Sequence, residues 1–290
     1  MSRNKKILII GSKGMAGHVI YYFLKENTSY DIVDIARDDS FFEPSYKFDI
    51  TDFDKLASTL SAEQPDIVIN CIGILNKDAE DHPDKAILLN SYLPHFLASK
   101  GEQSGFRLIH ISTDCVFNGR KGNYSENSVK DGIGFYAESK ALGEVVYKNN
   151  LTLRTSIIGP ELKLTGIGLF DWFMKQSGDV KGYVNAIWSG VTTLELSKAI
   201  LEAIKQELKG LHHLVNETSI NKFDLLILFK KIFSKDDLCI VPFEDYIVDK
   251  SLIISNRDFN YKVPGYGQML IELKDWIQLH THLYANSLSK

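Results

Sequence analysis

Cysteine is scarce in this sequence, and the few residues present form no recognisable pattern. Cys71, Cys115 and Cys239 are odd in number and far apart in a chain of 290 residues, which argues against a disulfide framework and against a zinc site. The eight histidines include one adjacent pair, His212 and His213, but neighbouring side chains on a strand point to opposite faces. We therefore expect no metal site.

Long apolar runs and an excess of charge of one sign are missing as well. No run approaches the roughly 18 apolar residues that a membrane-spanning helix needs. The basic start of the chain is followed by only four apolar residues before Gly11, which is too short for a signal peptide. The net charge of -4 provides no basic field that would attract nucleic acid or an anionic membrane. We expect a soluble cytoplasmic protein that binds neither.

Internal repeats and low-complexity tracts are also absent, and the chain instead alternates short β-branched runs with longer helical patterns. The runs predict strands at residues 6–10, 30–35, 66–70, 107–112 and 151–155. Helices are expected at 15–25, 51–60, 84–100, from 136 on, and at 194–208, 222–233 and 268–279. Thr51 and Asp54 are spaced as in a capping box at the start of one helix, and Pro94 would bend another. Such alternation indicates βαβ units with a parallel sheet.

The pattern predicts an α/β fold, with a Rossmann-type doubly wound parallel sheet followed by a smaller lobe. Residues 1–158 would form the Rossmann domain. Beyond them the alternation loosens, so residues 159–290 are expected to form mainly the C-terminal lobe. The two parts would be partly interleaved, with segments around 180–208 returning to the Rossmann domain.

A glycine-rich turn with the spacing G-x-x-G-x-x-G follows the first predicted strand. Gly11 would permit the tight turn, Gly14 would let the backbone approach a pyrophosphate, and Gly17 would allow close helix–sheet contact. Lys13 and Met15 lie in the same turn, and the N-terminus of the following helix would face the anion. Its place between a buried strand and a helix favours dinucleotide binding over a merely tight turn.

The end of the second predicted strand bears on which dinucleotide binds. An arginine there accommodates a 2′-phosphate, whereas an acidic residue binds the ribose diol. Arg37 favours NADPH, but Asp34 and Asp38 flank it and leave NADH open. All three could also be ordinary surface charges.

Tyr136 and Lys140 lie one turn apart on one face of a predicted helix. A nearby ammonium stabilises a phenolate and so eases proton transfer by tyrosine. The spacing alone is weak evidence, because Tyr21 and Tyr246 also have a lysine four residues later. The context is Thr113, with Asp114, at the end of the fourth predicted strand, where ligands of open α/β sheets bind. Their oxygens suit a substrate carbonyl, although a simple turn or cap is the alternative.

Together these motifs resemble the extended short-chain dehydrogenase/reductases. More narrowly, the chain is similar to the dTDP-4-dehydrorhamnose reductases and their relatives that act on other nucleotide-linked ketosugars. The resemblance spans the chain and is strongest over residues 5–160. Beside the glycine-rich turn and the Tyr136/Lys140 helix, it rests on the sequences at residues 48–52, 68–73, 89–94, 112–117 and 153–156.

The resemblance implies roles for individual residues. Thr113 matches the family's catalytic threonine, Tyr136 its acid and Lys140 its ribose-binding lysine. Further cofactor contacts would come from Asp49 and Ile50 near the adenine, from Cys71, Ile72 and Gly73 along the cofactor, and from Asn90. Asp49 could instead support a helix cap, Cys71 could be a small core residue, and Asn90 could be a satisfied helix amide.

The second lobe departs from the family pattern, which leaves the substrate contacts open. At residues 184–193 the usual Asp-Gln and proline are missing and Trp188 is present, which could stack on a sugar or base or belong to the core. The diphosphate of a nucleotide sugar would need cationic partners. Among Lys163, Lys175, Lys181 and Arg257, only Arg257 offers a planar fork for bidentate contact, although a surface ion pair is equally open.

The resemblance implies an NADPH-dependent oxidoreductase that reduces the 4-keto group of a nucleotide-activated deoxysugar during synthesis of cell-surface polysaccharide precursors. A homodimer is compatible with it. Tyr136 would protonate the developing alkoxide while Thr113 binds the same oxygen. Two alternatives stay open. One is an epimerase or dehydratase of the same superfamily, for which Asp114 offers only one acid. The other is a non-catalytic NADP-binding regulatory subunit, although such proteins can lose the tyrosine or lysine that this chain retains.

Overall fold

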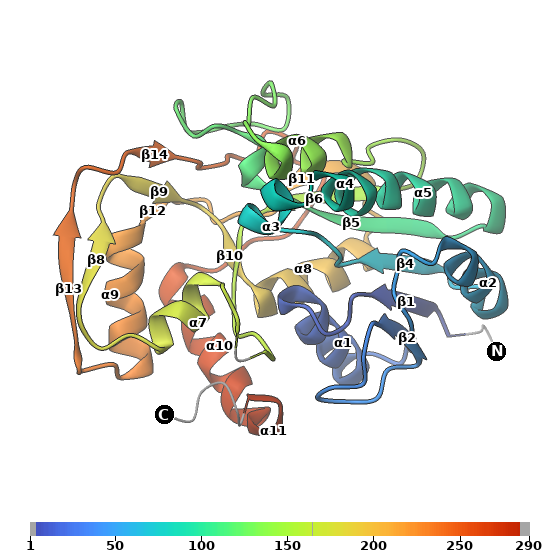
Figure 1. Cartoon of the computed structure of the whole chain (residues 1–290), viewed down its shortest axis with the longest axis horizontal. Helices are drawn as coiled ribbons and strands as arrows, with labels where there is room; N and C mark the ends of the chain where they lie inside the picture. Colours follow the sequence, from blue (N-terminus) through green and yellow to red (C-terminus); the bar gives the residue numbers. More distant parts are fainter. Residues whose placement is uncertain (1–3, 164, 285–290) are drawn as a thin grey trace.

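Buried apolar runs form one seven-stranded sheet in which all paired neighbours are parallel (Figure 1). The structure is a computed structural model and describes residues 4–163 and 165–284. The order across the sheet is β11-β6-β5-β4-β1-β2-β3, so the order reverses between β1 and β4, as in doubly wound folds. The strands are β1 (Lys6–Ile10), β2 (Asp31–Ala36), β3 (Tyr46–Lys47), β4 (Ile67–Asn70), β5 (Arg107–Thr113), β6 (Leu151–Thr155) and β11 (Gly210–His213). The predicted fold class is confirmed.

Helices cover both faces of the sheet, as the side-chain alternation along β1 requires. Ile7 and Ile9 belong to one core with α1 and α8, whereas Leu8 and Ile10 belong to a second core with α2 and α5. These helices are α1 (Met15–Asn27), α2 (Phe53–Glu63), α5 (Leu93–Ser104) and α8 (Thr193–Lys205). The four β1 residues are inaccessible to solvent, because a parallel sheet between two helical layers has no solvated face.

The long helix predicted at 84–100 is interrupted. The chain forms α4 (Pro83–Ala86), then a π-helical segment (Ile87–Tyr92), and then α5. Pro94 does not bend it, because this residue lies in the first turn of α5, where a missing N–H is tolerated. The irregularity lies before it, and the π-helical segment carries Asn90 into the interior. Such segments often occur at functional sites.

The start of α2 also differs by one residue from the prediction. Asp52 is the N-cap, and its carboxylate accepts the Lys55 N–H at 3.0 Å. Thr51 instead donates its hydroxyl to Asp49 at 2.8 Å. The capping box predicted with Thr51 as the cap is therefore wrong, although a helix does begin here.

Beyond β6, the described part of the chain builds a smaller lobe from short sheets and helices. Its strands are β7 (Ile157–Ile158), β8 (Gly178–Tyr183), β9 (Ala186–Trp188), β10 (Val191–Thr192), β12 (Ile220–Asn221), β13 (Leu238–Phe243) and β14 (Val248–Asp249). They pair as β13-β8, β12-β9-β14 and β10-β7. Its helices are α7 (Leu169–Met174), α9 (Lys222–Phe233), α10 (Tyr266–Leu279) and α11 (Thr281–Tyr284).

The two lobes are interleaved through α8 and β11. In Figure 1, α8 lies beside α1 under the large sheet, and β11 extends the sheet next to β6. The strands β8 and β9 also fall in the range predicted to return, but they belong to the small sheets. The part of residues 180–208 that packs against the large sheet therefore begins with α8.

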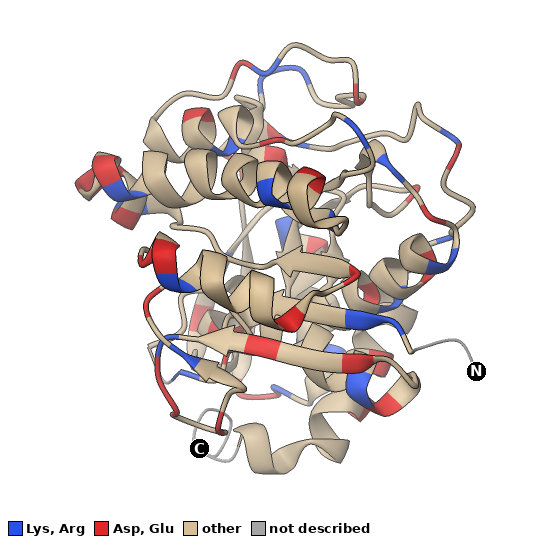
Figure 2. Ribbon diagram, turned by 90° about the vertical axis from the view of Figure 1, so that its right-hand side faces the viewer, with Lys and Arg blue, Asp and Glu red and all other residues tan. Residues whose placement is uncertain are grey.

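Two further observations concern the distribution of charged residues and the length of the apolar helices in the described residues. Figure 2 shows basic and acidic residues dispersed over helices and loops, with neither sign dominating this side of the molecule. Within residues 4–163 and 165–284, no helix combines the length and the apolar character needed to cross a bilayer.

Candidate active site

The glycine-rich turn lies at the carboxyl end of β1, beside the point where the strand order reverses. Gly11 has φ +85°, a conformation that favours glycine, and its N–H donates to the Ile35 carbonyl at 2.9 Å. A Cβ at Gly17 would lie 2.0 Å from the Gly11 oxygen, whereas one at Gly14 would meet only that oxygen, at 3.4 Å. The turn is therefore closed against the sheet at Gly17 and open to a ligand at Gly14.

Asp34 is occupied within the protein. It is fully buried, and its Oδ2 accepts the Ser12 hydroxyl at 2.5 Å. Its Oδ1 accepts the N–H and the hydroxyl of Ser45 at 2.9 and 2.8 Å. Asp34 thus ties the glycine-rich turn to β2 and the segment after it, and both of its oxygens are already engaged and out of reach of a ribose.

The neighbouring charges leave Arg37 as the accessible group at the end of β2. Asp38 accepts hydrogen bonds from Ser40, and its Oδ1 lies 3.7 Å from the Lys13 ammonium. Arg37 is exposed, and among residues 4–163 and 165–284 its guanidinium has no hydrogen bond or ion pair. Of the three candidates for selecting the dinucleotide, Arg37 is the one with free donors.

The other predicted cofactor residues follow neighbouring strands. Met15 begins α1, while Asp49 and Ile50 come after β3 and the 71–73 segment after β4. The Asp49 carboxylate accepts the Thr51 N–H and hydroxyl, and these bonds lower its pKa. Burial raises the pKa of the Cys71 thiol to about 12, and the Lys140 charge partly opposes that shift. The carboxyl edge of the sheet thus brings these segments together with the Lys140 helix.

Asn90 is held by hydrogen bonds within the chain. It is fully buried, its Oδ1 accepts the Ile74 N–H at 2.9 Å, and its Nδ2 donates to the Ile74 carbonyl at 2.9 Å. The same Nδ2 donates to the Ser139 hydroxyl at 3.0 Å. Since its hydrogen bonds go to the chain itself, Asn90 joins the segment after β4 to the helix that carries Lys140.

That helix, α6 (Phe135–Leu142), brings Tyr136 and Lys140 to Thr113. Burial raises the pKa of the Tyr136 phenol above its usual range, and its interaction with the Thr113 hydroxyl opposes part of this shift. The Lys140 ammonium donates to the Ile111 carbonyl at 2.7 Å, and burial lowers its pKa to about 8. A protonated phenol, a hydroxyl and an ammonium are thus gathered at one strand end.

Thr113 and Asp114 form a buried polar turn after β5. The Thr113 hydroxyl accepts the Cys115 N–H and donates to Asp114 Oδ1, both at 3.1 Å. Burial raises the pKa of the Asp114 carboxyl, while the charges of Lys250 and Lys222 oppose the rise. The predicted pair is present, and two lysines from the second lobe face it.

A buried ion pair holds the end of β5 next to β6. Glu144 accepts the Ser112 hydroxyl at 2.7 Å and pairs with the Arg154 guanidinium, also at 2.7 Å. Both charged side chains are about 1% exposed, and Lys130 adds a second cation 3.2 Å from Glu144, so the buried carboxylate is well compensated. This contact links β5, β6 and the end of the Tyr136 helix.

Glu80 is a positioning residue that the sequence did not reveal. It lies in α3 (Asn76–Asp81), and its carboxylate accepts the N–H groups of Phe135 and Tyr136, each at 3.1 Å. A Cβ at Gly134 would come within 2.7 Å of its Oε1, so glycine is needed for this approach. No local pattern signals the contact, because 56 residues separate Glu80 from Tyr136.

A cavity of about 360 Å³ opens beside Tyr136. The residues that line it come from both lobes: Asn76, Glu80, Cys115, Phe117, Asn118, Arg120, Ile133, Tyr136, Ala137 and Lys250. Trp188 is only 3% exposed and packs with Tyr266, so it is a core aromatic, although the Lys222 ammonium lies 4.8 Å from its ring centre.

Arg257 is not brought to this cavity. The chain around it runs along β11 in the opposite direction. The Ile253 carbonyl bonds to His213, and Asn256 Nδ2 donates to the Leu211 carbonyl. Further on, the Asn260 carbonyl accepts the Gln206 amide. The chain therefore passes Arg257 while moving toward the amino end of β11, and the side chain is exposed. The prediction that Arg257 binds substrate does not fit this placement.

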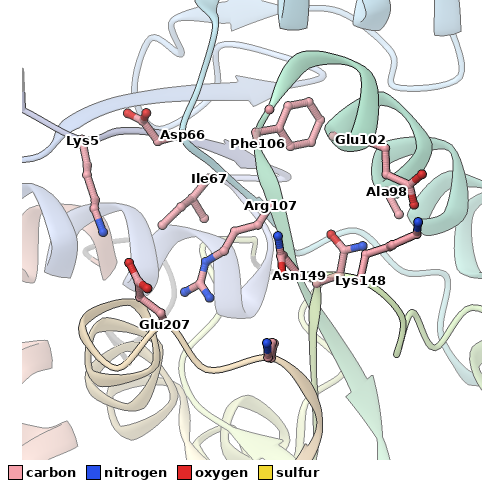
Figure 3. A pocket seen from close by; sticks show the side chains of 14 residues that line it. Lys5, Asp66, Ile67, Ala98, Glu102, Phe106, Arg107, Lys148, Asn149 and Glu207 are labelled. Atoms are coloured by element: carbon pink, nitrogen blue, oxygen red, sulfur yellow. The ribbon is translucent and has the colours of Figure 1, made fainter.

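A larger cavity, of about 500 Å³, lies at the opposite, amino edge of the sheet (Figure 3). Figure 3 shows Arg107 extending from β5 toward the turn that carries Glu207. The guanidinium donates to the carbonyls of Leu208 and Ala203 at 2.8 and 3.1 Å, so it satisfies the end of α8. None of the predicted catalytic residues lines this cavity.

Comparison with known proteins finds one family model over most of the chain and relatives that match parts of it. A family model described as the RmlD substrate binding domain matches residues 5–246. The chain is 32% identical over 143 residues to methionine adenosyltransferase 2 subunit beta of Danio rerio, covering 48% of this chain and 42% of that protein, less than half its length. It is 27% identical over 221 residues to the spore coat polysaccharide biosynthesis protein SpsK of Bacillus subtilis, covering 73% of each.

Among solved structures, the fold is similar to that of the dTDP-4-dehydrorhamnose reductase of Bacillus anthracis in complex with NADP. The TM-score is 0.80 at 20% identity, covering 94% of this chain and all of that one. At this identity the likeness concerns the fold.

Proposed function

We propose that this chain, which belongs to the RmlD substrate-binding domain family, is an NADPH-dependent reductase of the 4-keto group of a nucleotide-activated deoxysugar. The observation that carries the proposal is the convergence of Tyr136, Lys140 and Thr113 at the carboxyl edge of the sheet, next to the open glycine-rich turn. Similarity to a polysaccharide biosynthesis protein and to the fold of a sugar-nucleotide reductase supports it.

The residues around the turn fit a dinucleotide with a 2′-phosphate. Gly14 leaves room for a pyrophosphate at the start of α1, and Arg37 keeps its donors free where that phosphate would lie. Asp34 cannot bind a ribose diol because its oxygens are engaged by Ser12 and Ser45. NADPH, when bound, supplies the hydride.

Proton transfer would be the work of Tyr136. The raised pKa of its phenol keeps it protonated at neutral pH, so it is ready to protonate the oxygen of the reduced carbonyl. Thr113 would donate a hydrogen bond to the same oxygen once its hydroxyl hydrogen turns from Asp114 Oδ1 to the substrate. Lys140, with a pKa of about 8, is still mainly charged at neutral pH, so its ammonium can hold the ribose and stabilise negative charge that develops on Tyr136.

The test is product analysis by mass spectrometry after the protein is mixed with NADPH and a panel of ketosugar nucleotides. A reductase yields a product two hydrogens heavier and consumes an equal amount of NADPH. An epimerase or dehydratase would convert its substrate with no net NADPH consumption. Failure to convert any ketosugar nucleotide while NADPH still binds would overturn the proposal.

A second function is favoured by one observation, the similarity to methionine adenosyltransferase 2 subunit beta. A regulatory subunit would bind the dinucleotide without using Tyr136 and Lys140 for turnover. In that case Tyr136→Phe should leave NADPH affinity unchanged and there would be no ketosugar turnover to lose, whereas a reductase loses its activity.

A further inference from the structure

Two lysines of the second lobe lie on either side of β9, and the charges of both act on Asp114 in the catalytic turn. Asn221 of β12 and Asp249 of β14 both pair with Ile187 of β9. Lys222 and Lys250 are the next residues along the chain in each case. Since β12 runs antiparallel and β14 parallel to β9, Lys222 lies toward the Ala186 end of β9 and Lys250 toward its Trp188 end. The short sheet thus brings to one three-residue strand two lysines that are 28 residues apart in the chain.

The Lys222 ammonium is partly withdrawn from water, and the charge of Asp114 compensates only in part for this burial. It lies 4.8 Å from the centre of the Trp188 ring, and burial lowers its pKa to about 8. In the described ranges 4–163 and 165–284 no ion pair or hydrogen bond of this ammonium is found. A cation in such a place is costly unless a ligand supplies an anion.

Lys250 reaches the same place from the other side of β9. It lines the 360 Å³ cavity together with Tyr136 and Cys115, and its backbone N–H donates to the Ile187 carbonyl at 3.3 Å. Its charge lowers the pKa of Asp114 and of Cys115 against the effect of their burial. The ammonium therefore faces the catalytic turn.

The charges around this end of the cavity do not balance. Asp114 is the buried carboxylate on which both lysines act, and it can neutralise only one of them. Glu80 also lines the cavity and keeps its negative charge while it accepts the N–H groups at the start of α6. Arg120 on the cavity wall adds a third positive charge, so the positive charges still outnumber the carboxylates. An anionic ligand group would restore the balance.

We propose that Lys222 and Lys250 form the subsite that binds the phosphate groups of the substrate. This inference rests on the proposed function, since it names the part of a nucleotide sugar that the second lobe holds, but it can be tested without turnover. The glycine-rich turn lies on the other lobe, so this subsite is separate from the one for the cofactor pyrophosphate.

The test is calorimetric titration of the whole chain with dTDP, UDP and inorganic pyrophosphate, for the wild type, Lys222→Met and Lys250→Met. Each variant should bind the nucleoside diphosphates about tenfold or more weakly, the scale of one lost charged hydrogen bond. NADPH affinity should stay unchanged. Lys181→Met is the matched control, because that ammonium also lies over an aromatic ring of this lobe, 4.2 Å from the centre of Phe243, but belongs to β8, which pairs with β13 and not with β9.

The outcomes separate this inference from the proposed function. Wild-type affinity for dTDP and UDP in both lysine variants, or equal weakening by Lys181→Met, would overturn it, as would a wild type that binds none of the three ligands. If Lys222→Met does not fold, Lys250→Met decides, since Lys250 belongs to a strand end and not to the core. Lysine-dependent binding of dTDP or UDP without conversion of any ketosugar would uphold the subsite and refute the reductase. Binding of pyrophosphate as tight as that of dTDP would assign recognition to the phosphates alone.

Discussion

Replacing Glu80 by alanine should slow the reaction without weakening cofactor binding. The Glu80 carboxylate accepts the N–H groups of Phe135 and Tyr136 at 3.1 Å, and so holds the first turn of the helix that carries the proton donor. Loss of an acceptor at a helix N-terminus costs about 0.5–2 kcal/mol, and we expect about 1 kcal/mol of unfolding free energy because Glu80 is exposed.

The effect on the rate follows from how the rest of α6 is held. A misplacement of about 1 Å at a reacting group can cost roughly 10²-fold. Asn90 and Ser91 still bind Ser139, one turn further along, so the helix cannot move as a whole. We therefore expect kcat to fall about tenfold, with the dissociation constant of NADPH unchanged.

Steady-state NADPH oxidation, thermal unfolding and a binding titration measure the three quantities. Glu80→Gln keeps an oxygen acceptor and should recover most of the rate. Asp81→Ala removes the adjacent carboxylate of α3, which pairs with Lys77 on the surface, and should change nothing. A Glu80→Ala variant with wild-type kcat, or one whose loss is entirely in NADPH affinity, would refute the positioning role.

Three further predictions concern the residues that act on cofactor and substrate directly. Tyr136→Phe removes the proton donor and keeps the ring, so turnover should fall by at least about 10²-fold with NADPH binding intact; a variant that retains most of its turnover would exclude Tyr136 as the acid. Arg37→Ala should weaken NADPH binding by about 1.5–3 kcal/mol, the scale of a charged hydrogen bond, and leave NADH binding unchanged; equal losses for both cofactors would contradict a 2′-phosphate contact. The pKa of Lys140 is about 8, below its ordinary 10.5, so its charge is lost as pH rises through about 8 and the rate should decline there. Between pH of about 8 and 10.5, the folded chain has released the Lys140 proton while the unfolded chain still binds it. This lysine therefore makes the free energy of unfolding increase with pH in that range. Denaturation measured as a function of pH should show that Lys140→Met removes this increase.

The fold could be predicted where a single segment determines it. β1 and β6 have the predicted bounds because each is an uninterrupted buried run. The helix at 84–100 could not be predicted in detail, because its irregular segment depends on distant contacts. A Cβ at Gly143 would lie 1.8 Å from the Asn90 carbonyl oxygen, and Asn90 bonds to Ile74. Neither contact leaves a periodic signal near residue 90.

The same limit applies to the choice between Arg37 and Asp34. Both were visible in the sequence as candidates for the dinucleotide, and no local pattern separates them. Asp34 is removed from consideration by hydrogen bonds from Ser12 and Ser45, one before and one after it in the chain. Which residue is free to bind is therefore a property of the folded turn.

In the second lobe, position along the chain does not predict which charged residues reach the cavity beside Tyr136. Lys250 belongs to a tyrosine–lysine pair with the helical spacing, Tyr246 and Lys250, but no motif like the one at Thr113 precedes this pair. That pair does not form a catalytic helix, since Val248–Asp249 is a strand. Yet the Asp249 N–H donates to the Gly119 carbonyl at 2.7 Å, and this contact joins the strand to the segment just after Thr113. Lys250 therefore lines the cavity beside Tyr136, although the two are 114 residues apart in the chain. Arg257 follows only seven residues later, but there the chain runs along β11 and away from the cavity.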